Sequence, residues 1–196
     1  MDMNSNAVRG GIAALLLIVG LVAGWFGHKA LMSPADLATI SVYEDWRLAC
    51  PQLSQKDGSC EIQQDVLDAK TRTELARLSI FNVKSDKTLL ITVPFNVLLE
   101  PGVGIRIGTD PNDKPKFYPF ESCNGVGCMV RVAFKEDVAK MFADAAAGNK
   151  QIQLVIAGLD GKFVGLPFSL KGYKGGMAAF DSNDSKRHSW WSRLWS

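Results

Sequence analysis

The chain has 196 residues, of which 47% are hydrophobic and 21% are charged, and its formal net charge is +2. This length allows one globular domain of roughly 140–150 residues beside an atypical N-terminal segment. The near balance of 22 basic and 20 acidic residues excludes a strongly basic chain, so we expect no nucleic-acid partner.

The N-terminal segment predicts a single transmembrane anchor over residues 10–28. Residues 10–27 carry no charge and residues 12–26 read IAALLLIVGLVAGWF, a stretch of about the length that crosses a bilayer. We expect residues 1–9 to be cytoplasmic and residues 29–39 to form a tether. The alternative is a secretory signal that is cleaved near Val22-Ala23-Gly24.

Residues 40–180 predict a mainly β domain, an antiparallel β-sandwich. Short stretches rich in Val, Ile, Leu and Phe recur along it and alternate with Gly, Pro, Asn and Asp, as strands alternate with turns. Residues 40–50 are the first of these stretches. The other expected strands are 59–68, 76–84, 88–94, 104–108, 116–122, 128–134, 152–158 and 163–170.

One segment has helical instead of strand periodicity. Residues 136–147 place Val138, Met141, Phe142 and Ala145 at helical spacing, with acidic residues in the first turn and Gly148 after the end. This pattern predicts an amphipathic helix whose apolar stripe contacts the core. We expect it to cover an open edge or end of the sheet.

The four cysteines form two close pairs in the sequence, Cys50 with Cys60 and Cys123 with Cys128. Four cysteines allow three connectivities, of which we favour this local one, because each pair flanks a short turn. A zinc site and reduced thiols are the alternatives. Disulfides would place the domain outside the cytoplasm. We therefore predict a single-pass protein of the bacterial inner membrane with a periplasmic domain, or a periplasmic protein if the signal is cleaved.

Residues suited to catalysis are sparse. The two histidines, His28 and His188, lie outside the patterned region, and neither a nucleophile elbow nor a phosphate-binding loop occurs. We expect no enzyme activity, no metal and no cofactor. The alternatives are a purely structural domain and a hydrolase of envelope polymers, whose candidate carboxylates are Glu44, Asp45, Asp110, Asp113 and Glu121.

The C-terminal residues 181–196 predict a basic, Trp-rich flexible tail. Indole rings favour the membrane interface and cations favour anionic headgroups, so the tail could contact a membrane or a partner. A tail without contacts, or one docked on its own domain, is the alternative. The candidate contact residues are Arg187, Trp190, Trp191, Arg193, Leu194 and Trp195.

Several motifs together resemble the invasion-associated locus B family of bacterial envelope proteins. They are Trp46 before Cys50 and Cys60, residues 91–107 (ITVPFNVLLEPGVGIRI), residues 120–134 (FESCNGVGCMVRVAF) and residues 166–181, which contain S-L-x-G-[FY] as Ser169 to Tyr173 and are similar to the family's closing strand. The resemblance implies a periplasmic or surface-facing β-sandwich without an established catalytic site. It also implies an envelope or host-cell protein as a partner. We expect a membrane-anchored domain that binds a protein or envelope component.

Overall fold

The computed structural model describes residues 17–24, 38–52, 55, 58–108 and 114–188. It divides the chain into two units, Met1–Leu37 and Ala38–Ser196. Residues 17–24 of the first unit are helical, and the remainder of the predicted anchor lies outside the described residues. No helix among those described has both the length and the apolar character needed to span a membrane.

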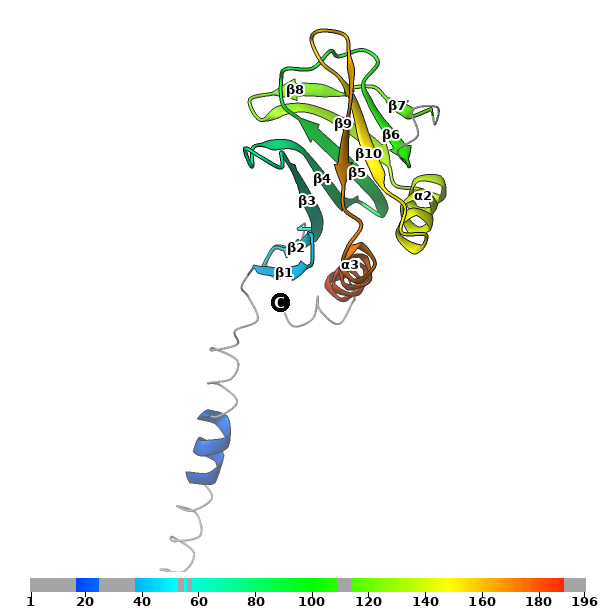
Figure 1. Cartoon of the computed structure of the whole chain (residues 1–196). Helices are drawn as coiled ribbons and strands as arrows, with labels where there is room; N and C mark the ends of the chain where they lie inside the picture. Colours follow the sequence, from blue (N-terminus) through cyan, green and yellow to red (C-terminus); the bar gives the residue numbers. More distant parts are fainter. Residues whose placement is uncertain (1–16, 25–37, 53–54, 56–57, 109–113, 189–196) are drawn as a thin grey trace, which may run out of the picture. The chain divides into compact units, whose positions relative to one another are not determined.

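The second unit contains a seven-stranded sheet in which all neighbouring strands are antiparallel (Figure 1). Its strand order is β1-β2-β3-β4-β5-β9-β8. The strands are β1 (Thr39–Tyr43), β2 (Trp46–Cys50), β3 (Glu61–Leu67), β4 (Glu74–Val83), β5 (Asp86–Val93), β8 (Ser122–Asn124) and β9 (Gly127–Ala133).

A four-stranded antiparallel sheet forms the second layer, with the order β11-β10-β6-β7. Its strands are β6 (Val103–Ile107), β7 (Lys116–Tyr118), β10 (Ile152–Ala157) and β11 (Phe163–Phe168). Side chains from both sheets form one buried core. The prediction of a mainly β, antiparallel sandwich-like fold is confirmed.

Strand β3 illustrates why these sequences form half-buried strands. Its residues alternate between the core and the outer face, since Ile62 and Val66 are buried while Asp65 faces outward. On that outer face Asp65 accepts hydrogen bonds from Arg47 and Arg77. In β3, every second residue is therefore buried, in step with the alternation of side chains along a strand.

Helix α2 (Glu136–Ala147) has the predicted bounds and connects β9 of the larger sheet to β10 of the smaller one. Val138, Phe142 and Ala145 of the predicted stripe are buried, and Met141 is partly buried. The Phe142 ring lies 5.5–5.6 Å from three other aromatic rings, those of Phe134, Phe168 and Tyr173. The stripe is thus a core contact, as predicted.

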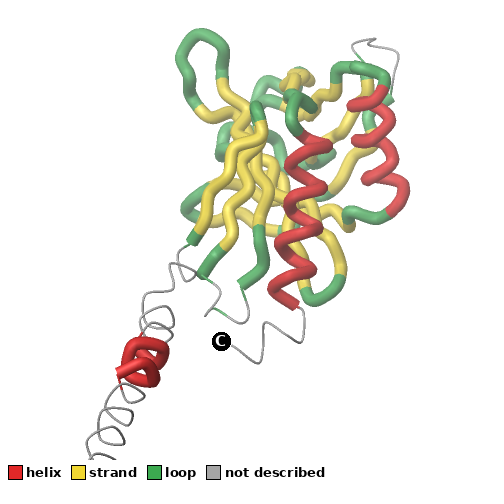
Figure 2. The backbone as a smooth tube through the Cα atoms, turned by 90° about the horizontal axis from the view of Figure 1, so that it is seen from below, coloured by secondary structure: helices red, strands yellow, loops and turns green. Residues whose placement is uncertain are grey.

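A second helix in this unit, α3 (Tyr173–His188), was not predicted. The strand expected over residues 163–170 is β11, which ends at Phe168, and the segment similar to the family's closing strand continues as α3. Residues 181–188, where we expected the flexible tail to begin, are helical. Tyr173 and Phe180 of α3 are buried, and the helix packs against β1, β2 and β3. Figure 2 shows α3 beside α2 along the strands. Tertiary contacts override a segment rich in Gly, Ser, Asn and Asp, which are poor helix formers.

The expected strand over residues 116–122 is also wrong as a single element. It is two short strands, β7 and β8, which belong to different sheets. Pro119 lies between them. Because proline has no N–H to donate to a strand ladder, it favours such a break.

Both local disulfides are present, Cys50–Cys60 and Cys123–Cys128. The first joins the last residue of β2 to the residue directly before β3, and the second crosses the β8–β9 hairpin, in which its two cysteines are directly paired. Among the described residues no cysteine is free. The disulfides close short loops and leave the sheet order to strand pairing.

Candidate functional site

Two turns meet at one end of the sandwich, the β5–β6 loop over residues 94–102 and the β10–β11 turn over residues 158–162. Val97 forms a β-bridge with Gly158, and the Leu98 N–H donates to the Ala157 carbonyl at 2.8 Å. At Gly102 the same loop passes close to the backbone of β7. A Cβ at this residue would lie 2.0 Å from the carbonyl oxygen of Tyr118, so only glycine fits there. The backbone of this end is therefore held by contacts between distant segments.

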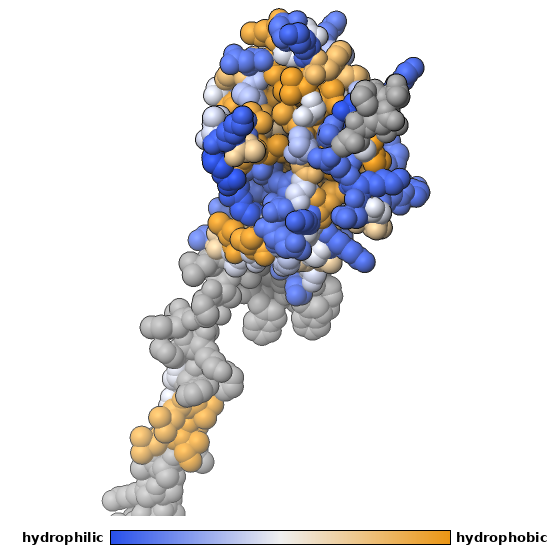
Figure 3. Space-filling model, in the orientation of Figure 1, coloured by the Kyte–Doolittle hydropathy of each residue, from blue (hydrophilic) through white to orange (hydrophobic). Residues whose placement is uncertain are grey.

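Large apolar side chains are exposed on these turns and on the first residue of β11. We call them the apolar end. Its members and their exposed fractions are Phe95 54%, Leu98 37%, Leu99 56%, Leu159 67% and Phe163 59%. Single exposed apolar residues are ordinary, but a group held together in one place is typical of an interaction site. Figure 3 shows hydrophobic atoms gathered over the upper part of the domain.

The apolar end continues onto the outer face of the smaller sheet. The ring of Phe163 on edge strand β11 lies 5.7 Å from the ring of Phe117 on the opposite edge strand, β7. Val155 on β10 pairs with Gly165 on β11 and with Gly104 on β6, and a Cβ on Gly104 would lie 3.0 Å from the Phe117 ring. The absence of a side chain on Gly104 therefore leaves room for the Phe117 ring, and Val155, which pairs with Gly104, is only 4% exposed.

Polar groups lie next to the apolar end. Lys162 and Asp160 form an exposed ion pair at 3.4 Å in the β10–β11 turn, and Glu100 is exposed beside Leu99. Further along the outer face, the Arg106 guanidinium donates to the Gln153 side-chain oxygen at 2.6 Å. An apolar centre with a polar border is the usual composition of a protein interface.

Residues 91–107 carry one of the family-like motifs, but their sequence alone does not predict this surface. The signal that could have found it is the apolar run between Pro94 and Pro101, which contains Phe95, Leu98 and Leu99. Prolines predict a loop there, and several large apolar residues in one loop are typical of a buried or interacting segment. The contribution of Leu159 and Phe163 depends on a contact between strands that no local pattern reveals.

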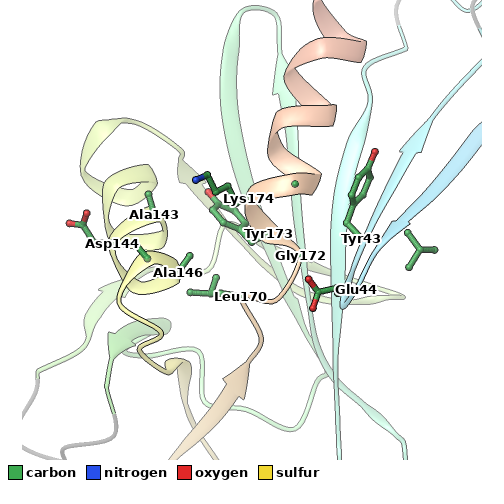
Figure 4. A pocket seen from close by; sticks show the side chains of 12 residues that line it. Tyr43, Glu44, Ala143, Asp144, Ala146, Leu170, Gly172, Tyr173 and Lys174 are labelled. Carbon is green, nitrogen blue, oxygen red and sulfur yellow. The ribbon is translucent and has the colours of Figure 1, made fainter.

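A pocket of about 810 Å³ lies between α2, the start of α3 and the β1–β2 turn (Figure 4). Glu44 and Asp144 supply carboxylates to its lining, and Tyr173 supplies a phenol. Burial raises the pKa of Tyr173 above its usual value, and the negative charge of Asp181 raises it further. The phenol therefore stays neutral at physiological pH and cannot serve as a base there. Asp144 forms an ion pair with Lys140 at 2.7 Å.

The candidate carboxylates predicted from the sequence are not gathered around this pocket. Glu44 lines it, whereas Glu121 pairs with Arg131 of β9 at 2.7 Å. The backbone carbonyl of Asp45 accepts a hydrogen bond from Gln64. Asp110 and Asp113 lie outside the described residues. In the part of the chain that the structure describes, no three His, Cys, Asp or Glu residues form a group suited to a metal ion.

One residue of the predicted tail contact, Arg187, is described. It lies on α3, and its guanidinium donates to the carbonyls of Gln52 and Gly58 at 3.3 and 3.5 Å. Both carbonyls belong to the loop closed by Cys50–Cys60. The contact of the tail with a membrane or partner stays a prediction, because its other residues lie outside the described ones: Trp190, Trp191, Arg193, Leu194 and Trp195.

Comparison with known proteins gives a family and a fold. The sequence model of the family described as invasion associated locus B (IalB) protein matches residues 46–181, which is more than half of the chain. The crystal structure of invasion associated protein B from Bartonella henselae is similar, with a TM-score of 0.56 and 18% sequence identity, over 74% of this chain and 97% of that one. At this identity the likeness concerns the fold alone. No curated protein matches the sequence.

Proposed function

Because the chain belongs to the invasion associated locus B family, we propose that it is a non-catalytic binding module of a bacterial cell envelope. It contacts a protein partner through the apolar end. The observation that carries this proposal is the grouping of Phe95, Leu99, Leu159 and Phe163, each more than half exposed, on two turns held by backbone contacts and on the adjoining first residue of β11.

The energetics favour a protein partner at this place. Full burial of an exposed Phe or Leu side chain contributes about 1.5–3 kcal/mol, and these half-exposed side chains would each gain about half of that. The translational and rotational entropy that two proteins lose on association offsets part of this free energy. A rigid group of four such side chains inside a polar border still has the features of an interface hot spot.

A catalytic role has less support. A hydrolase of envelope polymers would need two carboxylates that act together across a cleft. Of the two at the pocket, Asp144 is paired with Lys140 and has 62% of its side chain exposed. The proposal therefore assigns no reaction to the pocket.

The proposed location is the periplasmic side of the inner membrane, with residues 10–28 as the anchor. Its support is the uncharged N-terminal sequence together with two disulfides, which persist in oxidising compartments. The similar Bartonella protein is described as invasion associated. By extension, the partner of this chain would be an envelope protein or a host-cell protein.

The triple variant Leu99→Ser, Leu159→Ser, Phe163→Ser tests the binding role. We expect affinity for the partner to fall by more than about tenfold, since three anchors are lost. Native electrophoresis of the full chain, extracted from cell envelopes in mild detergent, would show the complex dissociate to the free chain.

The matched control is Leu67→Ser with Val83→Ser, which removes apolar surface at the ends of β3 and β4, where these side chains are 37% and 38% exposed. It should leave the complex intact. Equal loss in both variants, or no loss in either, would contradict a role for the apolar end. The unfolding free energy of each variant must also stay close to that of the original chain.

A further inference from the structure

The four edge strands of the two sheets differ in how they are protected from pairing. Strands β7 and β8 have only three residues each, and β11 carries Pro167, which cannot donate a hydrogen bond. Short length and proline are common devices against the pairing of exposed edges. Strand β1 has five residues, TISVY, with neither proline nor charge, and it pairs with β2 without a bulge.

The side chains of β1 that point away from the core are also apolar and exposed. Ile40 is 72% exposed and Val42 is 66% exposed. Tyr43, on the other face of the strand, lies against α3, since a Cβ on Gly175 would be 3.6 Å from its ring. In Figure 3, hydrophobic atoms gather at the lower edge of the domain as well as at its upper end.

The register shows which backbone groups of β1 are free. Tyr43 pairs with Trp46 across a two-residue turn, so these two residues form a hydrogen-bonded pair. Such pairs alternate along an antiparallel ladder. The N–H and C=O groups of Ile40 and Val42 therefore point away from β2, and no other strand in the described part of the chain pairs with them.

We propose that β1 pairs antiparallel with β1 of a second copy of this chain, about a two-fold axis at Ser41. In this register the free N–H and C=O groups of Ile40 meet those of Val42 of the partner subunit, and the reverse pair forms by symmetry. The exposed apolar side chains of the two copies then lie opposite each other on one face.

The second copy fits this edge because the strand is complementary to itself. One register satisfies the free backbone groups and also pairs Ile40 with an apolar residue, as a two-fold interface requires. The strand has no charge that would repel its copy. The inference concerns a different surface from the apolar end and does not depend on it.

Cysteine crosslinking of the full chain in membranes tests the pairing. Two Ser41 residues on the axis would form a non-hydrogen-bonded pair with Cα atoms about 4.5 Å apart, within the range that a disulfide spans. The Ser41→Cys variant should therefore give a disulfide-linked dimer on a non-reducing gel.

Thr39→Cys is the matched control, because Thr39 is also exposed on β1 but would lie about 13 Å from its copy across the axis. We expect at least about tenfold less dimer from it, since this exceeds disulfide reach. Val42→Pro, added to Ser41→Cys, removes an N–H that points outward and should abolish the crosslink. Absence of dimer from Ser41→Cys, equal dimer from both cysteine variants, or a crosslink that survives Val42→Pro would overturn the proposal.

Discussion

Replacing Gly172 with alanine is expected to lower the free energy of unfolding by about 3 kcal/mol or more, one of the largest effects available in this chain. Gly172 precedes α3 and has φ 77°, a conformation that side chains disfavour. A Cβ there would lie 1.9 Å from the carbonyl oxygen of Tyr43 and 2.5 Å from its carbonyl carbon. Both are backbone atoms, so the clash can be relieved only by separating α3 from β1. Urea unfolding measures the loss.

Gly161→Ala is the control that separates backbone strain from the clash. Gly161 has φ 76°, nearly the same as Gly172, but a Cβ there would meet nothing within 4 Å. Its substitution should lower the free energy of unfolding by only about 1 kcal/mol, because alanine disfavours this positive φ. If the two alanine variants lost the same stability, the close approach of β1 to α3 would not be a structural requirement.

Truncating Trp46 to alanine should remove about 3–5 kcal/mol of stability, because it empties a fully buried site. The Trp46 side chain is 0% exposed. Its ring lies 5.5 Å from that of Tyr173, and its indole N–H donates to the Ser169 carbonyl at 3.0 Å. The same substitution therefore also leaves a polar group without its donor.

Phe163→Ala is the matched comparison for Trp46→Ala, since it truncates an aromatic ring that is 59% exposed. It should cost less than about 1 kcal/mol, as exposed positions usually do. Comparable losses at the two positions, measured by urea unfolding, would contradict the assignment of Trp46 to the core and of Phe163 to the surface.

These two predictions give a physical meaning to motifs that resemble the family. Trp46 and the Ser169–Tyr173 segment are far apart in the sequence but meet in the core, where Trp46 contacts Ser169 and Tyr173. Gly172 allows the chain to turn into α3 against β1. In this domain the two motifs fix the position of a helix, and their residues need no catalytic role to explain them.

The parts of the fold that the sequence predicts well are those that depend on neighbouring residues. The bounds of α2 follow from an apolar stripe at Val138, Phe142 and Ala145, flanked by acidic residues and Gly148. Most strands coincide with the short stretches rich in Val, Ile, Leu and Phe that turn residues separate. The disulfides follow from the short spacing within each cysteine pair.

The parts that it misses depend on contacts between distant residues. Helix α3 has two adjacent glycines, and Gly176 lies so close to β3 that a Cβ would be 2.5 Å from the Ile62 side chain. This helix forms because it packs there. The apolar end likewise exists because Val97 pairs with Gly158, a contact that neither segment encodes alone.

The most direct test of the binding role is a photoreactive amino acid at Leu159 in the full chain, activated by light in intact envelopes. We expect a discrete adduct with one protein, which disappears when Phe95→Ser and Leu99→Ser are added. A probe at Lys140, on the exposed face of α2, should not form that adduct. If Leu159 gave no adduct, or the same adducts as Lys140, the apolar end would not be a binding surface.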